Sequence, residues 1–322
     1  MGRLEELRIN AYLSEVARGY SNNAFVAQSL FPTIYSEKEQ INIFEFNKEA
    51  FQIYDTERAI RANSNVIAPK GFKKHTATLT EHDLSYPIDY REEQEAEKVK
   101  LQLHATNVVT QGLQLKHEKK CADLVQNPDN YSSDNKIILS GSSCFNHKDS
   151  DPQGVVDDAK DAVSRKIAQD PNTMVIGQDA WRALKRNLSL RGLISNNTNK
   201  IITLEHLKEF FEIENIVIGK SIFTNEKGEF VRIWKDSIVL AYVPNLGTSR
   251  TEYDPSFAYT VKMKDALNID EYSKEGNKVK YIRATDIYTP FLVGAEAGYL
   301  ISNVVNPNLT RDEQGLVNND GQ

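Results

Sequence analysis

Residues 89–127 are expected to form one long helix, because no proline interrupts the chain there until Pro128. Asp89 followed by Glu92 is typical of a capping box, and an acidic first turn suits the positive end of a helix dipole. A helix of this length would span roughly 55 Å at ~1.5 Å per residue, about twice the width of a small globular core. The rest of the chain is therefore expected to pack along the length of this helix.

One face of this expected helix carries moderately apolar residues spaced three and four apart. They are Ala96, Val99, Leu103, Thr106, Thr110, Leu113, His117, Cys121 and Leu124. A two-stranded coiled coil is the simpler alternative, but the polar residues at the a/d-type positions count against it. The pattern favours a helix that lies across a flat plate of protein.

Composition excludes several classes of protein. The chain has 322 residues, is 40% hydrophobic and carries a net charge of −6, which indicates a folded protein and argues against one that coats nucleic acid. Two cysteines do not make a disulfide framework, so synthesis in a reducing cytoplasm is expected. The first residues lack the apolar core of a signal peptide, and no apolar run of about 18 residues predicts a membrane span.

Two segments before the long helix have apolar residues but no core of their own. Residues 1–35 contain a short amphipathic piece and then Phe25, Val26, Leu30 and Phe31, which need a partner surface. Residues 36–84 alternate apolar and polar residues around a polar middle, as expected for two long strands that carry a projecting tip.

The segment after the long helix alternates helix and strand patterns. Asp151–Gln169 predicts a helix, Thr173–Gly177 a buried strand, and Gln178–Asn187 a helix with Trp181 and Leu184 facing inward. Thr203 is placed to cap a further helix before a second buried strand, Asn215–Gly219. This order predicts an α/β layer.

Strand patterns dominate the remainder of the chain. A turn at 225–228 separates two short strands, others follow, and the last is Gly298–Val305. From Asn306 onward almost no residue is apolar, which predicts a frayed tail.

The order of these segments resembles the major capsid proteins of tailed double-stranded DNA phages, of the lambda coat-protein type. The resemblance covers roughly residues 15–305 and depends on the succession of segments, since no single motif is diagnostic. Its segments are YSNNAFVAQSLFP, the Arg61-Ala62 loop, TATLTEHDLSYPIDYREE, the long helix, NTMVIGQDAWRALKRNLSL, NIVIGKSIF, FVRIWKDSIVLAYVP and AGYLISNVV. It implies an α+β, Hong Kong 97-like fold.

The same resemblance implies a division into parts. They are an N-terminal arm (1–35), an extended loop (36–84), a peripheral domain with a spine helix (85–140 and 281–306), an α/β axial domain (141–280) and a flexible tail (307–322). The loop at residues 58–64, RAIRANS, contains less glycine than the same loop in many relatives.

Contacts between subunits are expected on the arm and the loop. The candidates are Phe25, Val26, Leu30, Phe31, Ile60, Val66 and Ile67. Some relatives cross-link a loop lysine to an asparagine of a neighbouring subunit, and Lys70, Lys73 and Lys74 lie in the matching segment. Lysines are also common in exposed loops for other reasons.

No catalytic residue, cofactor or metal site is expected. Gly141–Cys144 fits a connector better than a nucleophile loop, and Cys144 with His147 makes only half of a zinc site. His104 and His117 lie thirteen residues apart on the long helix, so satisfied or solvent-facing histidines are expected.

The resemblance implies a structural protein that self-assembles into pentamers and hexamers of an icosahedral head enclosing double-stranded DNA. Implied partners are other copies of the chain, scaffolding, portal and decoration proteins, and packaged DNA nearby; no membrane is implied. The implied location is the virion, after assembly in the host cytoplasm. An encapsulin-like nanocompartment shell of the same fold is the first alternative, and an α/β enzyme is the second.

Overall fold

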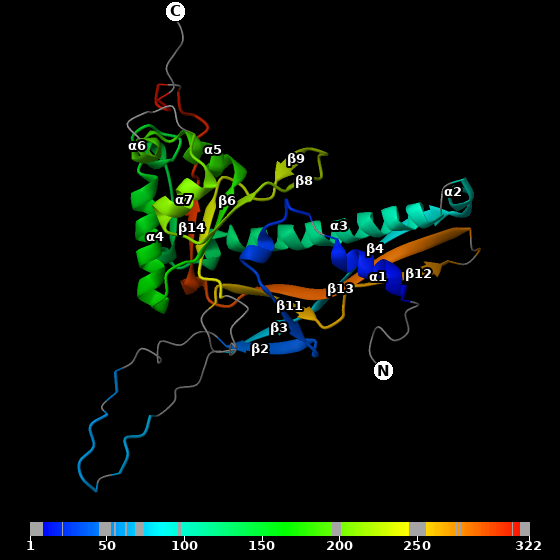
Figure 1. Cartoon of the computed structure of the whole chain (residues 1–322), viewed down its shortest axis with the longest axis horizontal. Coiled ribbons are helices and arrows are strands. Elements are labelled where there is room, and N and C mark those ends of the chain that lie inside the picture. The colour runs from blue at the N-terminus through cyan, green and yellow to red at the C-terminus, as the bar shows by residue number, and fades with distance from the viewer. Residues whose placement is uncertain are drawn as a thin grey trace, which may run out of the picture.

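The computed structural model describes most of the chain. Its described residues are 9–20, 22–44, 53–54, 56–61, 63–67, 74–95, 98–194, 201–244, 256–274, 276, 278–310 and 312–315. They form an elongated part built on one long helix and an α/β part at one end of that helix (Figure 1).

The expected long helix is present as two described helices. They are α2 (Tyr90–Glu95) and α3 (Lys98–Val125), so the main helix has 28 residues and spans about 42 Å. One half of the expected capping box lies at the start of α2, where the Asp89 N–H donates to Glu92 Oε2 at 2.9 Å, while the Asp89 side chain accepts from the Arg91 N–H at 3.0 Å. The prediction of a long spine is therefore confirmed, and α3 ends at Val125, two residues before the expected end.

Helix α3 contributes to two separate cores. Its middle packs on the elongated part through Ala105, Val109 and Leu113, and its C-terminal end enters the α/β core through Cys121 and Val125. Of the expected stripe, Thr106 and Thr110 are buried as well, but Val99 is exposed.

Gly112 lies at a close approach of α3 to the sheet. A Cβ at this position would lie 2.5 Å from Leu84 Cδ2, so glycine allows strand β4 to pack directly against α3.

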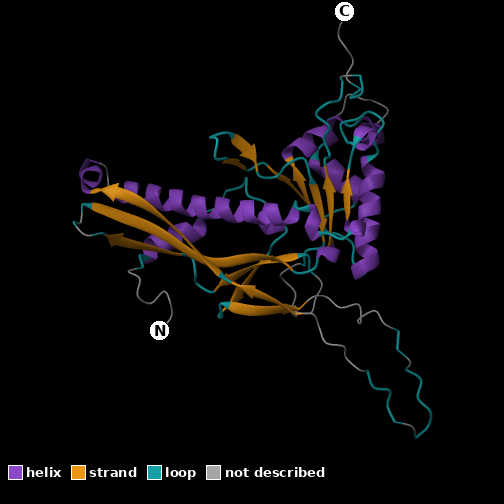
Figure 2. Ribbon diagram, turned by 180° about the vertical axis from the view of Figure 1, so that it is seen from behind, coloured by secondary structure: helices purple, strands orange, loops and turns teal. Residues whose placement is uncertain are grey.

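The elongated part contains a five-stranded sheet beneath α3 (Figure 2). Strand β13 (Val279–Leu292) is its centre and pairs antiparallel with β11 at one end, with β12 at the other and with β4 along its other edge. Strand β1 runs parallel to β11 at the outside. The other strands are β1 (Thr33–Ser36), β4 (Thr80–Asp89), β11 (Ala258–Met263) and β12 (Asn268–Ser273). Helix α1 (Ala11–Gly19) packs against α3 and buries Leu13 and Ala17.

The α/β part is a second five-stranded sheet with helices against it. Its order is β5-β14-β10-β6-β7, with β6 and β7 parallel and β10 antiparallel to both β6 and β14. The strands are β5 (Lys136–Ile138), β6 (Thr173–Gly177), β7 (Asn215–Gly219), β10 (Ile238–Ala241) and β14 (Gly298–Ser302). The helices are α4 (Pro152–Ile167), α5 (Gln178–Arg186), α6 (Leu188–Ile194) and α7 (Leu204–Phe211).

Local sequence signals explain these helices well. The Asp151 side chain accepts from the Gly154 N–H and caps α4, and Thr203 caps α7 as expected. Leu184 is fully buried on α5, whereas Trp181 is only half-buried, with Lys185 over its ring. The α/β layer is therefore present where the sequence predicts it.

The division between the two parts differs from the expected one. Strand β14 was expected in the peripheral sheet but lies between β5 and β10 of the α/β sheet, and β5 joins it there. Conversely, β11 and β12 belong with β13 in the elongated sheet. Strand β13 is long enough to pair with both of them along one edge, whereas β14 pairs with β5 and β10.

Two hairpins extend from these sheets. Strands β2 (Gln40–Phe44) and β3 (Lys74–Thr78) pair antiparallel at the base of the extended loop. Strands β8 (Ile222–Thr224) and β9 (Phe230–Arg232) pair around a turn in which Gly228 has φ of 80°. In both views the loop lies below α3 and the β8–β9 hairpin lies above it (Figures 1 and 2).

The start of the expected tail is attached to the α/β part. Asn306 exchanges two hydrogen bonds with the Asn146 side chain, at 2.8 and 3.0 Å, and the Lys148 N–H donates to the Glu313 carbonyl at 2.9 Å. Hydrogen bonds at Asn306 and Glu313 thus attach this stretch to the α/β part, and a flexible tail over residues 307–322 stays a prediction. Residues 316–322 are outside the described part.

Candidate assembly surfaces

Glu118 on α3 joins three parts of the molecule, although its side chain is only 2% exposed. Its carboxylate accepts the backbone N–H groups of Val26 and Ala27, both at 2.9 Å, and the indole N–H of Trp234 at 2.6 Å. The Ser221 hydroxyl donates to it at 3.4 Å. The arm, the long helix and the α/β part therefore meet at one buried carboxylate.

Burial raises the pKa of the Glu118 carboxyl, and the hydrogen bonds that it accepts lower it again in part. The donors compensate for the water that the carboxylate has lost. This arrangement holds residues 26 and 27 of the arm against α3 by their backbone, so it fixes the arm without depending on the arm's side chains.

The structure corrects the expectation for three arm residues. Val26, Leu30 and Phe31 pack in the α/β core of their own chain, and the last two have no exposed surface. They do need a partner surface, as the sequence indicates, but α3 and the α/β part supply it. Phe25 is half-buried and lines a cavity beside the arm.

That cavity, of about 410 Å³, lies between the arm, α3 and strands β11 and β13. His117 lines it and shares a 2.8 Å hydrogen bond with the Thr260 hydroxyl, which confirms a satisfied histidine. Desolvation, with Lys262 and Lys120 nearby, lowers the pKa of His117 from 6.5 to about 4. His117 is therefore neutral at neutral pH. His104, by contrast, is exposed.

His117 gives the protein a pH-dependent stability. Because the unfolded chain binds a proton near pH 6.5 and the folded chain only near pH 4, stability falls as the pH decreases through this window. At about 1.4 kcal/mol per pKa unit, wild type should lose about 3 kcal/mol more than His117→Gln between pH 7 and pH 4. Urea unfolding across this range measures it, and parallel pH profiles for the two proteins would contradict it.

The loop presents apolar side chains to solvent. Ile60 and Val66, two of the expected contact residues, are 93% and 89% exposed, and Ile67 is more than half exposed. Ile53, which the sequence analysis did not select, is 96% exposed. That these residues contact a neighbouring subunit stays a prediction. Of the candidate cross-linking lysines, Lys70 and Lys73 lie outside the described residues and Lys74 begins β3.

A second exposed apolar surface lies on the β8–β9 hairpin. Phe230 is 78% exposed and Ile222 is 48% exposed. Thr224 is paired with Phe230 across the hairpin, and Ile222 lies two residues from Thr224, so all three side chains share one face. This surface was not predicted from the sequence, although the alternation in both strands was the signal that could have revealed it.

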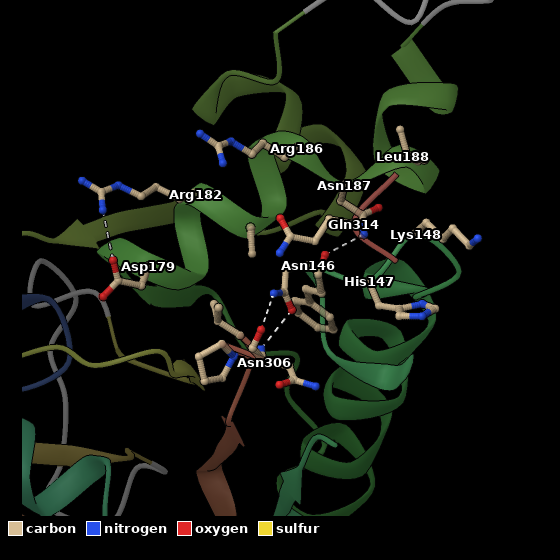
Figure 3. A pocket seen from close by; sticks show the side chains of 14 residues that line it. Asn146, His147, Lys148, Asp179, Arg182, Arg186, Asn187, Leu188, Asn306 and Gln314 are labelled. Carbon is tan, nitrogen blue, oxygen red and sulfur yellow. Dashed lines mark hydrogen bonds and ion pairs between the residues drawn. The ribbon is translucent and has the colours of Figure 1, made fainter. Parts of the chain in front are cut away.

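The polar groups around a cavity of about 270 Å³ in the α/β part are largely paired with one another (Figure 3). Asp179 forms ion pairs with Arg182 at 3.3 Å and with Arg232 at 3.2 Å. Asn187 donates to the Phe145 carbonyl and to the Ser150 hydroxyl. This arrangement fastens helices and loops together and places no nucleophile beside a base.

No metal-binding cluster of three or more histidine, cysteine or acidic side chains occurs among the residues that the structure describes. Cys144 is buried and donates to the Asn303 carbonyl, whereas His147 accepts from the Asp149 N–H. Within the described chain, no helix is both long enough and apolar enough to cross a bilayer.

Comparison with known proteins gives consistent results. A family model for phage major capsid protein E matches residues 56–285. A major capsid protein of Burkholderia phage BcepMu is 45% identical over 307 residues, which cover 94% of this chain and 99% of that protein. The crystal structure of a phage-related protein from Bordetella bronchiseptica RB50 has a TM-score of 0.79 at 28% identity and covers 94% of this chain and 99% of that one.

An encapsulin from Synechococcus elongatus PCC 7942 is also similar, with a TM-score of 0.51 at 10% identity and coverage of 95% of this chain and 100% of that one. At this identity the likeness shows a shared fold alone.

Proposed function

The chain belongs to the phage major capsid protein E family, a family of structural proteins of the virion, and we propose that its copies form pentamers and hexamers of an icosahedral shell around double-stranded DNA. The α+β, Hong Kong 97-like fold expected from the sequence is confirmed. Because these relatives are structural proteins, family membership also counts against the alternative of an α/β enzyme.

The observation that carries the proposal is the exposed apolar surface of the loop. Ile53, Ile60 and Val66 project far from either core and gain nothing from the chain's own packing. Apolar side chains gathered on one projection mark an interaction site. A head-to-tail contact that places this loop on the next copy closes into rings when the rotation allows it.

The proposal extends to partners of the shell. Scaffolding, portal and decoration proteins, and DNA near the inner wall, are the partners that membership in a phage capsid family supports. The encapsulin alternative has only the shared fold in its favour. Shells purified from infected or induced cells should protect DNA from nuclease, and shells that hold a cargo enzyme and no DNA would favour the alternative.

The loop residues provide the direct test of assembly. Wild type should form closed shells in electron micrographs, whereas a variant with Ile60→Asp, Val66→Asp and Ile67→Asp should remain as subunits, because three charges would have to lose water in the contact. The folded subunit should keep its stability within about 0.5 kcal/mol, since the side chains are exposed.

Ser64→Asp is the matched control, because it adds a charge to the same exposed loop without removing an apolar side chain. It should assemble as wild type does. A wild-type chain that stays monomeric at high concentration contradicts the proposed function, and normal shells of the triple variant exclude the loop as the contact.

A further inference from the structure

We infer that the exposed face of the β8–β9 hairpin is the docking site for the extended loop of a neighbouring copy of this chain. The inference rests on the proposed function, since it requires copies arranged in a ring. It identifies the surface that receives the loop, which is Ile222, Thr224 and Phe230 with Glu226 and Glu229 at the turn.

The position of the two features supports the pairing. The loop and the hairpin lie on opposite sides of α3 in both views of the molecule (Figures 1 and 2). In a head-to-tail ring, one side of each subunit faces the opposite side of the next. A feature on the loop side therefore meets the hairpin side of its neighbour, and the loop of one copy cannot meet the loop of the next by the same rotation.

The chemistry of the two surfaces matches. The loop offers the apolar side chains of Ile60, Val66 and Ile67, and the hairpin offers Phe230 and Ile222. An aromatic ring at the centre of an apolar patch is a typical anchor of an interface. Burying Phe230 against aliphatic side chains would remove its exposed surface from water, which nothing within the subunit does.

The charges are complementary as well. Arg61 lies at the turn of the loop tip, next to Ile60, and is exposed. Glu226 and Glu229 are exposed at the hairpin turn together with Lys227, so the turn is net acidic, and Glu229 directly precedes Phe230. Opposite charges at the rim of an apolar contact contribute mainly to its orientation and to the rate of association. The apolar side chains of the hairpin and the charges beside them therefore both favour the extended loop of a neighbouring copy as the partner.

The hairpin is also supported as a rigid platform. Its inner face carries Phe223, over whose ring the Lys119 ammonium of α3 lies at 4.9 Å. Asp179 of α5 holds Arg232 in β9 through the 3.2 Å ion pair. A docking loop would therefore meet a surface whose shape is already fixed, and less conformational entropy would be lost on binding.

Cross-linking of two single-cysteine variants tests the inference. Val66→Cys subunits and Phe230→Cys subunits are mixed, assembled and treated with a short bismaleimide; Cys121 and Cys144 are buried and should not react. A covalent dimer should form in the mixture, and its yield should be at least tenfold lower with either variant alone. Val99→Cys, exposed on the far part of α3, replaces Val66→Cys in the control mixture and should give no such dimer.

A charge exchange gives an independent readout. Arg61→Glu and Glu226→Arg should each raise the protein concentration needed for assembly several-fold, and subunits that carry both changes should return it to the wild-type value. A structural effect on the subunit would not be reversed in this way.

The outcomes separate this inference from the function. Shells that form without a Val66–Phe230 cross-link overturn the docking site and leave the shell proposal intact. Phe230→Cys subunits that cross-link only to one another place two hairpins together and also overturn it. Absence of any shell contradicts the proposed function itself.

Discussion

Glu118→Ala should destabilise the subunit by about 3–5 kcal/mol and release the arm from α3. The substitution leaves the N–H groups of Val26, Ala27 and Trp234 buried without their acceptor. An unsatisfied buried donor costs about 1–3 kcal/mol, and removing one partner from a buried charged site costs about 3–5 kcal/mol. Equilibrium unfolding in denaturant measures the loss.

Hydrogen exchange locates the effect. The amide hydrogens of Val26 and Ala27 should exchange faster in Glu118→Ala, whereas those of strands in the elongated sheet should be changed only by the global loss of stability. The loss of stability in Glu118→Gln should lie between that of wild type and that of Glu118→Ala. Glutamine keeps one acceptor oxygen, but its amide NH₂ group would face other donors.

Glu214→Ala is the matched control, since it removes an exposed glutamate and should change stability by less than about 0.5 kcal/mol. Unchanged stability and unchanged amide exchange in Glu118→Ala would show that the arm is held by its apolar side chains alone.

Gly177→Ala should prevent the α/β part from folding. A Cβ on Gly177 would lie 1.7 Å from the Lys235 carbonyl oxygen, a backbone atom that has no free rotation, and 3.2 Å from the Ser237 carbonyl oxygen. The Gly177 N–H donates to that Ser237 oxygen at 2.9 Å, so strand β6 cannot shift away without losing the pairing. The cost exceeds the ~1–3 kcal/mol of ordinary overpacking in a core.

The expected result is accumulation of the variant in inclusion bodies and no cooperative unfolding transition for any protein that remains in solution. Gly192→Ala is the control, because nothing lies within 4 Å of a Cβ there and alanine favours the helix. Its stability should equal or exceed that of wild type by up to about 1 kcal/mol. A stable, cooperatively unfolding Gly177→Ala protein would show that the β6–β10 region adapts.

Much of the fold could be predicted because local signals determine it. Thr203 acts as a cap where expected, and α4 begins within the stretch where a helix was expected. The order of helices and strands in the α/β part follows the hydrophobic pattern, and the long helix follows from the absence of proline. Local signals do not determine which distant strands pair with each other. Gly298–Ser302 is an apolar run that fits either sheet, and its pairing with β5 and β10 is seen only in the structure.

The buried carboxylate could not be predicted for a related reason. Glu118 lies in the sequence Lys116-His117-Glu118-Lys119-Lys120, which has the composition of a solvated helix face. Its partners Val26 and Trp234 are 92 and 116 residues away in the chain. For the same reason the apolar arm residues indicated a missing partner surface correctly but did not say whether it belonged to the same copy.

Strands β13 and β14 have a consequence for synthesis on the ribosome. β13 is the centre of one sheet and β14 lies inside the other, yet both come after residue 278. Strand β4 cannot pair until β13, about 200 positions later in the chain, has been synthesised. Pairing between such distant segments slows folding. A nascent or truncated polypeptide therefore lacks the central strand of the elongated sheet and an inner strand of the α/β sheet, so we expect only finished copies to assemble.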